Sequence, residues 1–115
     1  MHENTDHDSL ESEIERRSFV RAVLVAERMA LSEEEIRGIR FKALGQMSAI
    51  YRNVYGTKYL AQQYCYSMEE VKQLLEQFAH ELKIEGNMKP LEPCYDYNTG
   101  KYLSFNEWMD HYIKS

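Results

Sequence analysis

The side chains that could do chemistry are few and scattered along the chain. Two glutamate–histidine pairs stand four residues apart: Glu76 with His80 and Glu107 with His111. Each pair would share a helix face, but neither has a third metal ligand nearby in sequence. Cys65 and Cys94 lie outside any CxxC motif and outside any glycine-rich nucleophile turn. The sequence therefore predicts no catalytic residue, no metal site and no cofactor, and a protein that is not an enzyme.

The segment 96–107 (DYNTGKYLSFNE) resembles an EF-hand calcium loop in the spacing between its first and last acidic residues. It departs from that motif at two positions. Gly100 stands where a ligand oxygen is expected, and Lys101 stands where the sharp turn needs glycine. We therefore predict a β-hairpin followed by a helix here, and no calcium site.

Tyrosines are concentrated in the middle of the chain. Five of the nine tyrosines fall between Tyr51 and Tyr66. Tyrosine and arginine are enriched at protein interfaces, because a tyrosine ring buries apolar area while its hydroxyl stays hydrogen-bonded. The candidate partner-binding residues are Arg52, Tyr55, Tyr59 and Tyr66. The leading hypothesis is a non-catalytic interaction protein that binds a protein partner or itself as a homodimer; the alternative is that these rings only cover the rim of the core.

A second hypothesis comes from residues 57–75 (TKYLAQQYCYSMEEVKQLL), which resemble a helix-turn-helix motif. Apolar residues occupy its inward positions: Leu60, Ala61, Tyr64, Tyr66, Val71 and Leu74. Ser67 would cap the second helix, and Cys65 stands where the motif usually has glycine. The resemblance covers a sixth of the chain and is compatible with a purely structural three-helix unit.

If the resemblance extends to function, it implies a DNA-binding regulator. Residues 36–68 contain no acidic residue, which favours a local basic patch. The candidate DNA-binding residues are Arg37, Arg52, Lys58, Lys72 and Gln73. Glu69, Glu70 and Glu76 would lie close to the phosphates, which is electrostatically unfavourable.

Arg40 lies within the apolar stripe of its predicted helix, where a guanidinium needs a carboxylate partner. Glu27 lies in the apolar arc of the preceding helix and is the candidate partner in a buried ion pair. The alternative is that Arg40 extends to solvent at the edge of the stripe.

The composition fits one globular domain of 115 residues with a net charge of −5. This charge disfavours general binding to nucleic acid or to anionic membranes. The chain has no apolar run long enough to span a bilayer and no signal peptide, and with two cysteines we expect a cytoplasmic protein with reduced thiols and no membrane partner.

Helical periodicity and capping residues set the expected elements. We expect a disordered tail over 1–9 and one domain over 10–115, with helices at 10–30, 33–55, 58–65 and 68–84, a hairpin over 95–105 and a last helix after it. Serine capping boxes are predicted at Ser32, Ser67 and Ser104. Gly38, Gly45 and Ala49 share one face of the second helix, where we expect the first helix to pack closely. The predicted fold is mainly α, an orthogonal bundle of about four to five helices with a small C-terminal β-hairpin.

Overall fold

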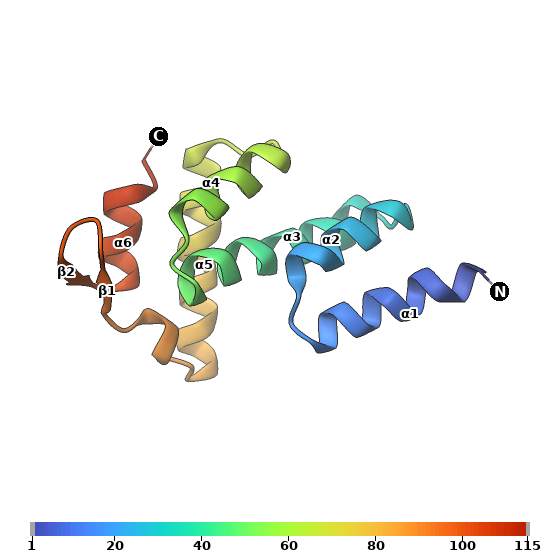
Figure 1. Cartoon of the computed structure of the whole chain (residues 1–115), viewed down its shortest axis with the longest axis horizontal. Coiled ribbons are helices and arrows are strands. Elements are labelled where there is room, and N and C mark those ends of the chain that lie inside the picture. The colour runs from blue at the N-terminus through green and yellow to red at the C-terminus, as the bar shows by residue number, and fades with distance from the viewer. Residues whose placement is uncertain (1, 115) are drawn as a thin grey trace. The chain divides into compact units, whose positions relative to one another are not determined.

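A computed structural model describes the backbone of residues 2–114 and the side chains of residues 9–114. The fold is mainly α: within the described residues there are six α-helices and one small antiparallel sheet, which confirms the predicted fold class (Figure 1). The chain forms two compact units, residues 1–43 and 44–115, and each is described by itself. The assignment of residues 10–115 to one domain stays a prediction.

The first unit contains α1 (His2–Glu15), α2 (Phe19–Arg28) and most of α3 (Glu33–Gly45). Its core is a small apolar cluster drawn from all three helices: Leu10, Ala22, Val25, Ala26 and Ile36. Helix α1 begins at His2, so it includes residues predicted to form a tail.

The continuous helix predicted over 10–30 is wrong, because the chain turns between α1 and α2. Arg17 adopts a left-handed conformation (φ 58°). The Arg17 N–H donates to the carbonyl of Ile14, and the Ser18 N–H donates to the carbonyl of Glu13. This pair of hydrogen bonds is a Schellman motif, which ends α1. This stop could not be predicted from the residue type, because glycine is the residue that usually marks it.

The second unit contains the end of α3, the π-helix η1 (Gln46–Ile50), α4 (Val54–Gln63), α5 (Met68–Glu85) and the 3-10 turn η2 (Lys89–Leu91). The strands β1 (Cys94–Asp96) and β2 (Lys101–Leu103) then pair antiparallel, with Tyr95 opposite Tyr102, before α6 (Phe105–Tyr112). The largest fully buried side chains include Trp108, Phe105, Leu44 and Leu75. The core of this unit therefore joins α3, α5 and α6.

The helix predicted over 33–55 is also wrong beyond Gly45. The Ser48 hydroxyl donates to the carbonyl of Leu44 at 2.7 Å, and such a competing side-chain bond accompanies the change from α- to π-helix. A new helix then begins at Val54, because the Asn53 side chain accepts the Gly56 N–H at 2.8 Å. Gly56 and Thr57, which fall between the helices predicted at 33–55 and 58–65, thus lie inside α4.

The three predicted serine caps are present at the starts of their helices. Complete capping boxes join Ser67 with Glu70 and Ser104 with Glu107, and Gly86 ends α5 in the left-handed conformation. The capping box at Ser32 is incomplete. The Ser32 side chain accepts the Glu35 N–H at 3.2 Å, but the Glu35 carboxylate accepts from the Ser32 hydroxyl and not from its backbone N–H. Local capping signals therefore fix three helix starts.

The glycine face of α3 was predicted to pack on the first helix, but this prediction is wrong. The face instead receives one aromatic ring from α5. A Cβ at Gly45 would collide with the Phe78 ring from α5, whereas a Cβ at Gly38 would meet nothing within 4 Å. Helix α2 instead packs on the apolar stripe that contains Ile36 and Ile39. Gly45 is therefore needed for the packing of α5, and Gly38 is not.

We expect opposite results from one substitution at these two glycines. Gly38→Ala should stabilise the protein by up to about 1 kcal/mol, because alanine favours an exposed helix. Gly45→Ala should destabilise it by about 2 kcal/mol, because the Phe78 ring must leave its place. Urea denaturation followed by circular dichroism measures both, and a stabilising Gly45→Ala would contradict the packing described here.

Candidate functional site

Arg52 holds together the parts of the second unit that carry exposed tyrosines. Its Nη1 donates to the carbonyl of Leu103 at 2.9 Å, and its Nη2 donates to the carbonyls of Pro90 (3.1 Å) and Glu92 (2.9 Å). The guanidinium also lies 5.5 Å from the centre of the Phe105 ring. Burial lowers the pKa of Arg52, although this group stays protonated.

These contacts assign Arg52 a structural role that the sequence did not suggest. Arg52 was predicted to face a protein partner or DNA phosphates. Its Nε also donates to the carbonyl of Ala49 at 3.3 Å, so four hydrogen bonds within the fold use its donors. Arg52 therefore holds the parts of the candidate site together.

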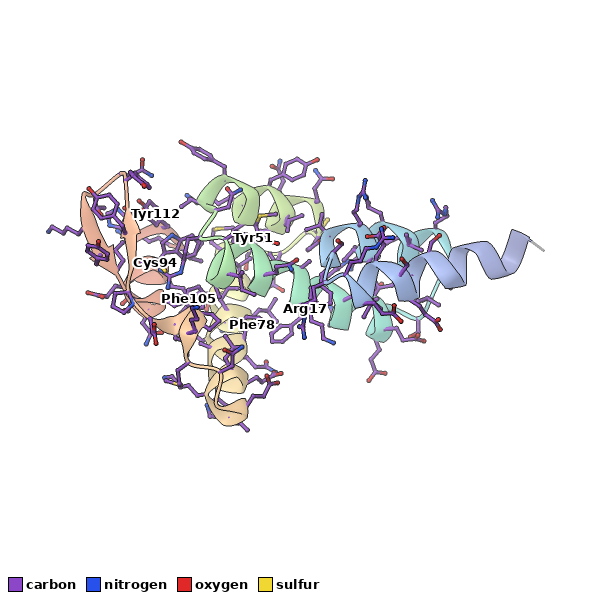
Figure 2. All side chains as sticks on the ribbon, turned by 60° about the horizontal axis from the view of Figure 1, so that its bottom comes forward. Arg17, Tyr51, Phe78, Cys94, Phe105 and Tyr112 are labelled. Carbon is purple, nitrogen blue, oxygen red and sulfur yellow. The ribbon has the colours of Figure 1, made fainter. Side chains whose placement is uncertain are left out.

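The clamped segments enclose a hollow of about 320 Å³, which we call the tyrosine hollow. Tyr51 before α4 and Tyr55 in its first turn contribute from one side, and the hairpin contributes Tyr95 and Tyr97. Trp108 of α6 also lines it. Tyr51 and Cys94, from the two sides of the hollow, are labelled in Figure 2. Two segments about forty residues apart in sequence thus form one aromatic site.

The rings around the hollow are largely open to solvent. Tyr55 is 85% exposed and Tyr97 is 89% exposed, although both are large apolar groups. Tyr95 makes edge-to-face contacts with Tyr97 (centroids 4.9 Å apart) and Tyr102 (5.3 Å), which orders the hairpin rings without covering them. Such a group of exposed aromatic rings is typical of a binding surface.

The predicted partner residues are only partly brought together. Tyr55 lines the hollow, whereas Tyr59 is exposed on α4 outside it. Tyr66 is half-buried and packs edge-to-face on Tyr64. The hairpin tyrosines were missed as binding residues. Their alternation along two short strands was the available signal, but it was used only to predict the hairpin.

A polar network fixes the hairpin beside α6. The Tyr112 hydroxyl donates to Asp96 Oδ2 at 2.7 Å, and the Thr99 N–H donates to the same oxygen at 3.0 Å. These hydrogen bonds lower the pKa of Asp96, while burial raises the pKa of Tyr112. Asp96, the first residue of the segment with calcium-loop spacing, is therefore engaged within the fold.

The indole N–H of Trp108 is a buried polar group. The residue is 1% exposed and stacks near Phe105, yet its indole N–H is buried without an acceptor among the described residues. A buried donor without a partner costs free energy, on the order of 1–3 kcal/mol. This donor therefore adds a local energetic cost to the packing of α6.

The helix-turn-helix-like segment has the expected order of elements. Helices α4 and α5 are joined at residues 64–67, and Cys65, where the motif has glycine, adopts a left-handed conformation (φ 61°). The Cys65 N–H donates to the carbonyl of Gln62, and the Tyr66 N–H donates to the carbonyl of Ala61. The cysteine thus occupies the backbone conformation that explains glycine at this position.

The candidate DNA-binding residues lie in mixed electrostatic surroundings. Lys72 lies 3.3 Å from the Asp110 carboxylate, and Arg37 lies 3.8 Å from Glu33. A second hollow, of about 410 Å³, brings Lys72 and Gln73 beside two acidic residues, Glu69 and Glu76. Lys58 is exposed on α4. The exposed face of α5 is therefore not a basic surface.

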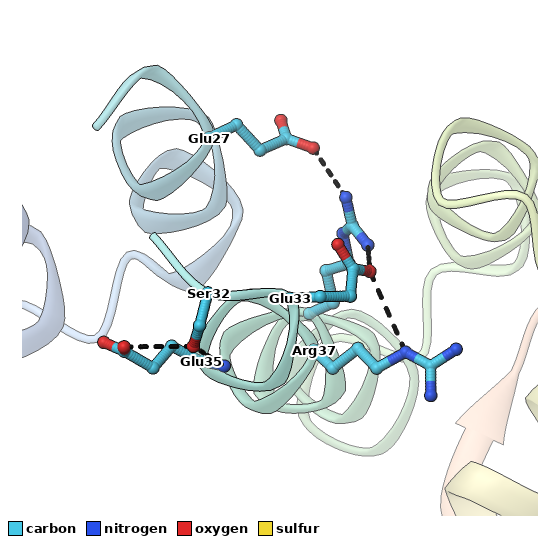
Figure 3. A network of polar contacts seen from close by, with 6 residues as sticks. Glu27, Ser32, Glu33, Glu35 and Arg37 are labelled. Carbon is cyan, nitrogen blue, oxygen red and sulfur yellow. Dashed lines mark hydrogen bonds and ion pairs between the residues drawn. The ribbon is translucent and has the colours of Figure 1, made fainter. Parts of the chain in front are cut away.

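The first unit contains the predicted Glu27–Arg40 ion pair, but the pair is only partly buried, because the Glu27 side chain is 41% exposed. Arg40 Nη2 lies 2.8 Å from Glu27 Oε2, and Arg40 Nη1 lies 3.0 Å from Glu33 Oε1 (Figure 3). The Arg40 side chain is 15% exposed, and the two carboxylates reach it from the more exposed side. The pair lies at the edge of the apolar cluster and links α2 to α3, so its role is structural.

The metal-binding side chains and the thiols of the described residues do not form another candidate functional site. Within residues 9–114, no three His, Cys, Asp or Glu side chains are grouped so that they could hold a metal ion. Cys65 and Cys94 are both free and exposed. No helix in the described part of the chain has the length and apolar character needed to cross a bilayer.

Comparison of the chain with protein-family models, with curated proteins and with solved structures finds no match.

Proposed function

We propose that this chain is a non-catalytic interaction protein whose contact surface is the tyrosine hollow with its exposed rim. The observation that carries this proposal is the convergence of Tyr51 and Tyr55 with Tyr95 and Tyr97 on one hollow. The fold uses Arg52 to hold these segments, but it leaves the rings themselves exposed.

The chemistry of the rim suits a protein partner. A tyrosine ring brings a large contact area, loses little conformational entropy on binding and carries a hydroxyl for hydrogen bonding. Binding energy at interfaces is concentrated in such aromatic residues around a buried centre. The partner is another protein or a second copy of the chain. The two free, exposed thiols support a reducing compartment, and we place the protein in the cytoplasm.

Photo-crosslinking tests this function in cells. We expect p-benzoylphenylalanine at Tyr55 and at Tyr97 to form the same covalent adduct, because both side chains border one hollow. The matched control is Ile84, which is exposed on α5 and does not line the hollow. Mass spectrometry then identifies the adduct: a doubled chain indicates a homodimer, and a different protein indicates a separate partner. An absence of adducts at Tyr55 and Tyr97, or equal yields at Ile84, would contradict the proposal.

DNA binding through residues 57–75 is the second candidate function. The left-handed Cys65 in the turn between α4 and α5 favours it, whereas the acidic neighbours of Lys72 disfavour it. This candidate predicts a mobility shift on mixed duplex DNA at low salt. The shift should weaken about tenfold with Lys72→Ala and with Gln73→Ala, but not with the control Lys83→Ala at the far end of α5. If no salt concentration supports a shift, DNA binding is excluded.

A further inference from the structure

The π-helix η1 ends two residues before Arg52 and shifts the backbone register there by one residue. The Tyr51 N–H donates to the carbonyl of Gln46, five residues back, at 3.0 Å. In an α-helix the same N–H would donate to the carbonyl of Met47, four residues back. Single π turns next to α-helices are rare, and they occur frequently at functional sites. We therefore asked what this turn does for the tyrosine hollow.

Both ends of η1 are fixed by contacts within the second unit. Before it, Leu44 is fully buried and Gly45 lies against the Phe78 ring of α5. After it, the Arg52 guanidinium donates to three carbonyls of residues 90–103. One residue corresponds to about 100° around an α-helix. An α-helical η1 would therefore direct Arg52 away from these carbonyls.

Two side chains hold the π turn in place. Ser48 is fully buried, and its hydroxyl donates to the carbonyls of Leu44 (2.7 Å) and Gly45 (3.3 Å). Arg52 donates from Nε to the carbonyl of Ala49 at 3.3 Å, in addition to its three distant acceptors. Against these hydrogen bonds stands the left-handed backbone of Arg52 (φ 50°), which costs free energy. The π turn is therefore maintained by side-chain hydrogen bonds that a local change can remove.

We propose that η1 is a conformational switch that controls the tyrosine hollow. In the π form, Arg52 holds the hairpin beside the start of α4. In the α form, Arg52 leaves its carbonyls, Tyr51 turns out of the lining and the hollow opens. This inference rests on the proposed function, because it names the regulation of that surface. A partner that contacts both sides of the hollow binds the π form, so binding shifts the equilibrium toward this form.

Nuclear magnetic resonance of the full chain measures the register of η1 directly. A scalar coupling through the hydrogen bond identifies the carbonyl that accepts the Tyr51 N–H. The coupling should join Tyr51 to Gln46 in the unmodified chain and to Met47 in the Arg52→Ala variant, because the clamp is lost. The matched control is Lys58→Ala, which removes an exposed cation of α4 and should leave the Gln46 coupling in place.

Ser48→Ala tests the same switch while the Arg52 clamp is kept. Loss of the hydroxyl should raise the population of the α form about tenfold. Relaxation dispersion then detects millisecond exchange at the Tyr51 and Arg52 amides, and circular dichroism confirms that each variant is folded. A Tyr51 amide that keeps its Gln46 coupling in folded Arg52→Ala would overturn the proposal. An absence of exchange in Ser48→Ala would also overturn it.

Photo-crosslinking in the Arg52→Ala variant separates this proposal from the interaction function. Adducts from p-benzoylphenylalanine at Tyr55 and Tyr97 should fall about tenfold, because the open form lacks one side of the surface. Undiminished adducts with η1 in the α form would refute the switch alone and leave the interaction function standing. Adducts that are absent even with Arg52 intact would refute the interaction function, and the switch with it.

Discussion

The arrangement of the second unit depends on the hydrogen bonds of one guanidinium. Arg52 lies between η1 and α4 in a left-handed conformation (φ 50°), which costs a non-glycine residue on the order of 1 kcal/mol. Its guanidinium donates hydrogen bonds to the carbonyls of Pro90, Glu92 and Leu103. Hydrogen bonds to a charged group contribute about 1.5–3 kcal/mol each. The hydrogen bonds outweigh the strained backbone. They place the hairpin beside the start of α4, and the tyrosine hollow follows from that placement.

Features that depend on neighbouring residues could be predicted from the sequence. The capping boxes at Ser67 and Ser104 fix the starts of α5 and α6, and Gly86 marks the end of α5. The hairpin followed from aromatic residues on both sides of an Asn-Thr-Gly turn. The Glu27–Arg40 pair was also predictable, because a guanidinium inside an apolar stripe needs a carboxylate that an adjacent helix can supply.

The helix breaks at Arg17 and Arg52 could not be predicted, because residues with little preference for the left-handed conformation adopt it there. Arg17, Ala30, Arg52 and Cys65 all have positive φ, and each lies where a helix ends. Glycine or asparagine usually marks such a stop. Tertiary hydrogen bonds select this conformation at Arg52. The breaks near Ala30 and Cys65 were predicted, because Ser32 and Ser67 cap the helices that follow them.

The candidate site was predicted only in part, because it joins segments that are distant in sequence. Tyr55 was identified from the cluster of tyrosines. No local pattern predicts that Tyr97 lies at the same hollow, because the contact depends on the tertiary fold. Arg52 was also assigned to the site, but for the wrong reason: its charge suggested a partner, whereas its donors bind three distant carbonyls. A basic residue in a tyrosine-rich segment can therefore build the surface that it borders.

The most direct test is amide hydrogen exchange in the Arg52→Lys variant. Lysine keeps the charge but cannot donate to three separated carbonyls at once. The account predicts that exchange accelerates at least about tenfold for amides of β1 and β2, while amides in the middle of α5 keep their protection. Unchanged exchange in the hairpin, or an equal loss of protection in α5, would contradict the claim that Arg52 holds the tyrosine hollow together.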